Sequence, residues 1–109
     1  MMELNEYQEQ AGTTNIYPHG PVGLYAEVMG LCSEAGEVAG KAKKVIRDND
    51  GDIHGYRAVM LAELGDVLWY VSQVADRLGF SLENLAVHNL GKLQARQERG
   101  AIGGSGDER

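Results

Sequence analysis

The sequence has little of several features that often identify a protein class, and each shortage excludes something. It contains one cysteine, Cys32, which cannot form an internal disulfide, so we expect a cytoplasmic protein in which this thiol is a small buried residue. The N-terminus lacks the basic and then apolar stretch of a signal peptide. No run reads as long or apolar enough to span a membrane, so we expect no membrane partner.

Positive charge is also scarce, because 10 Lys and Arg residues face 16 Asp and Glu residues, for a net charge of -6. An acidic chain binds a phosphate backbone poorly, so we expect no nucleic-acid partner. A small phosphorylated ligand held through metal ions remains compatible with this charge. The length of 109 residues and the hydrophobic fraction of 43% suit one globular domain with a modest core.

The sequence lacks the alternation of apolar and polar residues that is typical of β-strands. Apolar residues recur instead at intervals of three and four, as in α-helices. This spacing predicts helices over residues 2–12, 22–47, 56–78 and 82–99. Gly12 and Gly79 can end two of these helices, and Ser81 is a good N-cap for the last. The expected fold class is all-α, a four-helix bundle over residues 1–99 followed by a glycine-rich tail, 100–109, that could close over a ligand.

The helix expected over residues 56–78 is apolar on more than one side, because Leu61, Leu68 and Ala75 extend its main stripe. Such a helix needs neighbours all round, so we expect a core that continues across a subunit interface, in a homodimer or a dimer of dimers. Glycines inside the preceding helix cost about 1 kcal/mol each relative to Ala. Close helix approach or room for a ligand would offset that cost at Gly30, Gly36 and Gly40.

Two pairs of acids carry the chemistry that the sequence predicts. Glu34 and Glu37 are three residues apart in one expected helix, and Glu63 and Asp66 are three apart in the next. An offset of three returns to nearly the same helix face. Four carboxylates brought together repel one another unless a cation compensates them. Hard oxygen ligands suit Mg²⁺, with Mn²⁺ as the alternative, so we expect these four acids to be metal ligands.

Two other metal sites can be set aside on the sequence. Residues 48–52 superficially look like a calcium loop, but the glycine is misplaced for an EF-hand and the twelfth position would be Val59. A di-iron carboxylate bundle needs Glu-x-x-His motifs, and no Glu in the chain has a His three residues later.

The order of the acids resembles that of the MazG-like nucleoside triphosphate pyrophosphohydrolases, an all-α superfamily. Their pattern is Glu-Glu-x-x-Glu and then, after a helical spacer, Glu-x-x-Asp. Here it reads Ser33-Glu34-Ala35-Gly36-Glu37 and, after 25 residues, Glu63-Leu64-Gly65-Asp66. Further matching segments are Asp66-Val67-Leu68-Trp69-Tyr70, Asn89-Leu90-Gly91-Lys92-Leu93 and the tail Gly104-Ser105-Gly106-Asp107-Glu108-Arg109. The resemblance therefore covers nearly the whole chain.

The resemblance implies Mg²⁺-dependent hydrolysis of (deoxy)nucleoside triphosphates to the monophosphate and pyrophosphate, and a role in sanitising nucleotide pools is compatible with it. It implies that the four acids hold the metal and that Glu34 or Glu37 is also the general base. It implies a homo-oligomer, dimeric or tetrameric. The side chains expected to bind substrate are Lys41, Lys44, Asn89, Lys92, Arg96, Asp107 and Arg109.

One departure from the pattern supports an alternative function. Ser33 stands where the family has its first Glu, and a hydroxyl is a poorer metal ligand than a carboxylate. The alternative is a non-catalytic helical homodimer of the same fold that binds a nucleotide or a protein partner. Trp69 and Tyr70 are interpreted as core or dimer-contact aromatics rather than as residues that stack on a base. The three histidines share no motif and are not expected to be ligands.

Overall fold

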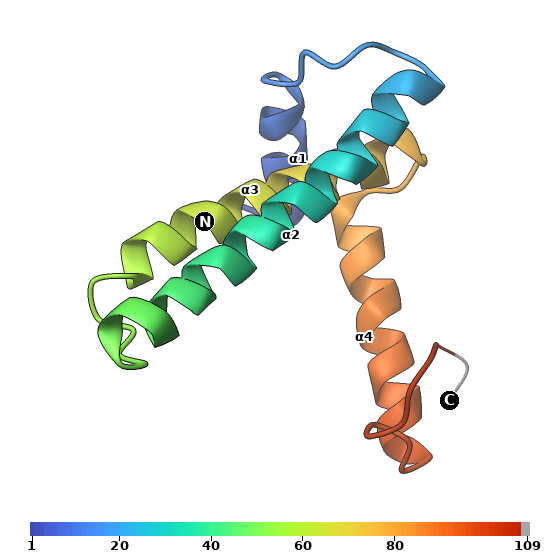
Figure 1. Ribbon diagram of the computed structural model, residues 1–109. Coiled ribbons are helices and arrows are strands. Elements are labelled where there is room, and N and C mark those ends of the chain that lie inside the picture. The colour runs from blue at the N-terminus through green and yellow to red at the C-terminus, as the bar shows by residue number, and fades with distance from the viewer. Residues whose placement is uncertain (108–109) are drawn as a thin grey trace.

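The computed structural model describes residues 1–107, and within these residues every regular element is an α-helix (Figure 1). The helices are α1 (Leu4–Gly12), α2 (Pro21–Asn49), α3 (Arg57–Arg77) and α4 (Leu82–Glu98). The expected all-α class is confirmed, and the helix ends differ from the expected ones by only one or two residues. Residues 108–109 lie outside the described part of the chain.

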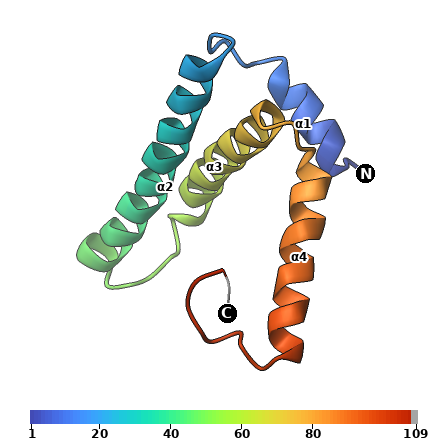
Figure 2. The same ribbon diagram turned by 90° about the vertical axis from the view of Figure 1, so that its right-hand side faces the viewer.

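The long helices α2 and α3 lie side by side and antiparallel, and they make the most extensive helix contact in the chain (Figures 1 and 2). Pro21 opens α2, where a missing backbone N–H costs nothing. The helix ends at Asn49 and is capped by Asp50, whose φ of 53° is left-handed and whose N–H donates to the carbonyl of Val45. Gly51, with φ of 77°, continues the turn that leads into α3.

Helix α1 caps the start of α4. The first N–H groups of a helix have no partner inside it. The N–H of Leu82 donates to Gln8 Oε1 at 3.0 Å, and that of Glu83 donates to Asn5 Oδ1 at 3.0 Å. The predicted N-cap is confirmed, because Ser81 Oγ accepts from the N–H of Asn84 at 3.0 Å. Two of these three caps come from α1, so the first helix fixes where α4 begins.

From that point α4 leans away from α2, and the two helices do not pack on one another within residues 1–107 (Figure 2). The radius of gyration is 16.6 Å, whereas a compact domain of this length has one of about 13 Å. The buried apolar residues of the described chain are Ala11, Val45, Ala75 and Leu82. One chain therefore leaves much apolar surface open.

Two expectations from the sequence were wrong. Cys32 is exposed rather than buried, because it lies on a face of α2 that no other described element covers. By length and composition, α3 is apolar enough to cross a membrane, although no such run was expected. Core helices of soluble proteins pass the same test, and α3 packs along α2, so this property is weak evidence for a membrane span.

Gln8 offers a direct test of how the helices are joined. Its buried side chain donates to the carbonyls of Ser72 and Phe80, at 3.0 and 3.2 Å, besides accepting from Leu82. Replacing Gln8 by Ala leaves these backbone groups without partners, so we expect unfolding free energy to fall by about 2–4 kcal/mol in urea denaturation. The exposed Gln10→Ala is the matched control, with an expected change within about 0.5 kcal/mol. An equal loss of unfolding free energy in both variants would contradict the conclusion that Gln8 joins the helices.

Candidate metal centre

Three carboxylates meet where α2 passes α3. Glu34 comes from α2, Glu63 and Asp66 come from neighbouring turns of α3, and one oxygen of each lies within 4.8 Å of the others. We call these three side chains the acidic cluster. The antiparallel packing of the helices brings the two predicted motifs together, although they are distant in sequence.

The electrostatics of the acidic cluster favour a bound cation. Burial raises the pKa of Glu34, and the negative charges of Asp66, Glu63 and Glu37 raise it further, in that order. A divalent cation would relieve this repulsion. Three carboxylate oxygens form a hard donor set, so the residues present fit Mg²⁺ or Mn²⁺.

Two residues of the first motif lie apart from the acidic cluster. Glu37 is exposed and is not among the clustered ligand atoms of the described residues, although its charge acts on Glu34. Ser33 is also exposed. The ligand and general-base roles of Glu37 remain predictions.

A cavity of about 350 Å³ lies beside the acidic cluster. We call it the acidic cavity, and its lining residues are Thr14, Glu34, Asp66, Trp69 and Tyr70. The indole N–H of Trp69 donates to Thr14 Oγ1 at 2.9 Å. The rings of Trp69 and Tyr70 meet edge to face, with centroids 4.9 Å apart. Both aromatics, interpreted from sequence as core or dimer contacts, therefore form a wall of the acidic cavity in this structure.

Tyr70 is held firmly in that wall. Its hydroxyl lies 2.7 Å from the hydroxyl of Tyr17, and this hydrogen bond, followed by burial, raises the pKa of Tyr70 to about 12. The ring lies against α2 at Gly30, where an added Cβ would collide with it. The expected close approach is confirmed at Gly30, whereas Gly36 and Gly40 face open space in the described chain.

The lysines expected to bind phosphate from α2 occupy different surroundings. Lys41 Nζ lies 3.8 Å from Glu63 Oε1, which places one positive charge at the edge of the acidic cluster. Lys44 is exposed on the same helix, one turn further on. Lys41 is therefore beside the expected metal site, and the structure does not bring Lys44 to it.

The cations expected on α4 bind the tail. Arg96 Nη2 donates to Asp107 Oδ1 at 2.9 Å and to its carbonyl at 3.2 Å, and Lys92 Nζ lies 3.3 Å from the same carboxylate oxygen. Asn89 is exposed on α4. No residue of α4 lines the acidic cavity in the described chain, because α4 leans away from α2. Arg109 lies outside the described residues.

The site contains residues that the sequence did not predict. A sequence pattern could have identified some of them but not the others. Trp69 and Tyr70 follow Asp66 by three and four positions, so helical spacing alone could have placed them on its face. Thr14 and Tyr17 belong to an irregular loop without periodicity, and their positions depend on contacts with α3. No sequence signal could have identified these two.

Comparisons with known proteins match nearly the whole chain. The family model for the MazG nucleotide pyrophosphohydrolase domain matches residues 26–100, which include both acidic motifs. The chain is also similar to the Gene 37 protein of Mycobacterium phage L5, at 47% identity over 114 residues, covering 99% of this chain and 100% of that protein. No solved structure is significantly similar to the chain.

The docking of the tail should depend on pH through Asp107. Hydrogen bonds from Arg96 and then Lys92 hold the pKa of Asp107 below its usual range. A carboxyl whose pKa is lower in the docked state stabilises docking above its ordinary pKa of about 3.9. That stabilisation is lost as the pH falls through the lowered value.

We therefore expect the NMR amide signals of residues 100–107 to change with a midpoint below about pH 3.9. In Asp107→Asn, which removes the charge, the tail should be undocked at every pH and this transition should be absent. An unchanged titration in Asp107→Asn would show that another group controls the tail.

Proposed function

The chain belongs to the MazG nucleotide pyrophosphohydrolase family, and on that premise we propose that it hydrolyses (deoxy)nucleoside triphosphates to the monophosphate and pyrophosphate with the help of Mg²⁺. The observation that carries the proposal is the meeting of Glu34, Glu63 and Asp66 beside a cavity open to a ligand. An acidic protein can hold a triphosphate at such a site only through cations, so a metal is part of the proposal.

Each residue of the site has a proposed task. Glu34, Glu63 and Asp66 would hold the metal, which when bound would polarise the phosphoryl group under attack and offset its negative charge. Glu34 would also accept a proton from the attacking water, because it lines the acidic cavity beside the expected metal. Lys41 would face phosphate oxygens from the rim. Trp69 and Tyr70 would form the wall beside the bound nucleotide and limit the access of water to it.

The decisive experiment measures pyrophosphate release from a panel of ribo- and deoxynucleoside triphosphates, with Mg²⁺ and with EDTA. We expect Asp66→Asn and Glu34→Gln each to lower kcat/KM by at least about 100-fold, because each removes a metal ligand. Asp76→Asn is the matched control, since it makes the same change on the exposed face of the same helix. Its activity should equal that of the unmodified protein.

Other outcomes have definite meanings. Full activity in Asp66→Asn would contradict the proposed site, and release of orthophosphate would mean that a different bond is cleaved. Metal-dependent nucleotide binding without turnover would favour the non-catalytic alternative that Ser33 keeps open. Glu37→Gln decides the role of an exposed acid, because a loss of activity there would mean that Glu37 joins the site only when metal and nucleotide bind.

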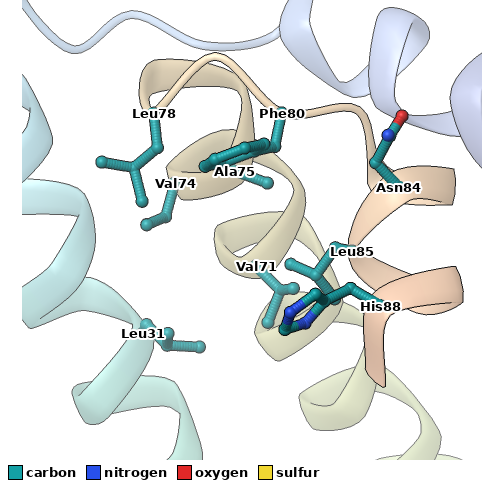
Figure 3. A pocket seen from close by; sticks show the side chains of 9 residues that line it. All are labelled: Leu31, Val71, Val74, Ala75, Leu78, Phe80, Asn84, Leu85 and His88. Carbon is teal, nitrogen blue, oxygen red and sulfur yellow. The ribbon is translucent and has the colours of Figure 1, made fainter. Parts of the chain in front are cut away.

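We also propose that the functional form is a homodimer or a dimer of dimers. A second cavity of about 460 Å³ lies between α2, α3 and α4. Figure 3 shows the apolar side chains that line it. We call it the apolar cavity, and its lining residues are Leu31, Val71, Val74, Ala75, Leu78, Phe80, Asn84, Leu85 and His88. Leu78 and Phe80 are more than half exposed there. A helix from a second copy would cover this surface, and its α4 could bring Lys92 and Arg96 to the acidic cavity.

A charge placed in the apolar cavity should prevent this association. We expect Leu78→Asp to shift the molar mass measured by light scattering from the dimer or tetramer to the monomer, because burial of an unpaired carboxylate is costly. Ile46→Asp is the control, since Ile46 is 75% exposed and does not line the cavity. If only Ile46→Asp dissociated the protein, the interface would lie at the far end of α2.

A further inference from the structure

We propose that the buried ion pair of Glu27 and Arg77 is a positioning device that holds the loop of residues 13–20 against the acidic cavity. This inference deepens the proposed function and rests on it for its kinetic consequence. Neither residue lines the acidic cavity, and neither belongs to the acidic motifs. Their effect on the site would pass entirely through the loop.

The ion pair itself is well defined. Arg77 Nε donates to both carboxylate oxygens of Glu27, at 2.8 and 3.0 Å. The side chain of Glu27 is 0% exposed and that of Arg77 is 16% exposed. The pair joins the first part of α2 to the last turn of α3, about two turns from Glu34 on α2 and three turns from Asp66 on α3.

The same two side chains hold the loop at both of its ends. Arg77 Nη1 donates to the carbonyl of Pro18 at 2.8 Å and to that of Gly20 at 3.4 Å. At the beginning of the loop, Asn15 Nδ2 donates to Glu27 Oε1 at 2.9 Å and to Gln73 Oε1 at 3.0 Å. A planar guanidinium can serve the carboxylate and the carbonyls together, which the ammonium of Lys cannot reproduce.

The packing around the pair leaves the loop little freedom. Gly23, in the first turn of α2, is buried, and an added Cβ would collide with the Pro18 carbonyl and with the Arg77 guanidinium. Asn15 Oδ1 also accepts from the N–H of Tyr17 at 2.9 Å. The loop backbone is therefore held on both sides of Tyr17, at Asn15 and at Pro18.

The loop in turn contacts the wall of the acidic cavity at two points. Thr14 Oγ1 accepts from the indole of Trp69 at 2.9 Å, and the hydroxyl of Tyr17 lies 2.7 Å from that of Tyr70. Thr14 itself lines the cavity next to Glu34 and Asp66. Displacement of the loop would remove one lining residue and release two aromatic rings, whereas the acidic cluster would stay on α2 and α3.

This arrangement separates nucleotide binding from metal binding, whereas loss of a merely structural ion pair would weaken both. Loosening the loop should weaken nucleotide binding and leave metal binding intact. Trp69 is the only tryptophan of the chain, so its fluorescence reports on the loop contact without any ligand.

The test compares Arg77→Lys and Asn15→Ala with the unmodified protein. In both variants we expect red-shifted Trp69 emission and stronger acrylamide quenching, similar to those of Thr14→Val. That substitution removes the acceptor of the indole N–H, together with the bond from Thr14 Oγ1 to the Ala11 carbonyl. The Kd for Mn²⁺ alone should stay within about twofold, because the three ligands remain on their helices. KM for the nucleotide should rise by about 10-fold or more, with kcat changed much less. Arg47→Lys alters an exposed ion pair and should change nothing.

Two outcomes would overturn the inference. Unchanged Trp69 quenching in folded Arg77→Lys and Asn15→Ala would show that the pair does not hold the loop. Loss of Mn²⁺ affinity parallel to loss of nucleotide affinity would show a general effect on the helices. If Arg77→Lys failed to fold, judged by its helical circular dichroism, Asn15→Ala would decide, because it leaves the ion pair in place. Absence of turnover in the unmodified protein would refute the proposed function alone, since the fluorescence and Mn²⁺ measurements need no activity.

Discussion

Like charges held together at one point of the α2–α3 contact are the constraint on which this structure depends. Glu34, Glu63 and Asp66 would separate if their helices were free to move, and burial already disfavours the charged form of Glu34. Further along the same two helices, Glu27 is fully buried but is paired with Arg77. One helix contact thus carries a fully paired acid and a cluster of three acids in which Lys41 approaches only Glu63, so the cluster still offers a cation something to stabilise.

The remaining helices serve mainly to complete this contact. Helix α1 donates no residue to the acidic cavity, but Gln8 and Asn5 supply the caps from which α4 starts. The loop between α1 and α2 reaches the acidic cavity because Asn15 and Arg77 tie it to α2 and α3. Little of this organisation relies on a large apolar core. Directional hydrogen bonds to buried polar side chains position the site, and such bonds are costly to leave unmade.

The sequence predicted the helices and part of the site because both follow from local periodicity. The N-cap at Ser81 and the meeting of Glu34 with Asp66 could be inferred from motifs and spacing. The direction of α4 could not, since it depends on Gln8, more than 70 residues away in sequence. The loop contacts of Thr14 and Tyr17 likewise depend on partners on α3. Glu37 is exposed and lies outside the acidic cluster, although its motif suggested a ligand. Local sequence patterns determine which segments form helices, whereas contacts between residues distant in sequence determine how those helices are arranged.

The tail has a consequence for how anions would reach α4. Asp107 already supplies a negative charge to Lys92 and Arg96, and Arg96 is almost completely buried beneath it. A phosphate arriving at these cations would replace one anion by another rather than fill an empty place. The local charge would then change less than in ordinary ion pairing, so added salt would screen the incoming and the outgoing partner alike. Exchange of this kind would make anion binding on α4 less sensitive to ionic strength than binding to exposed, unpaired cations.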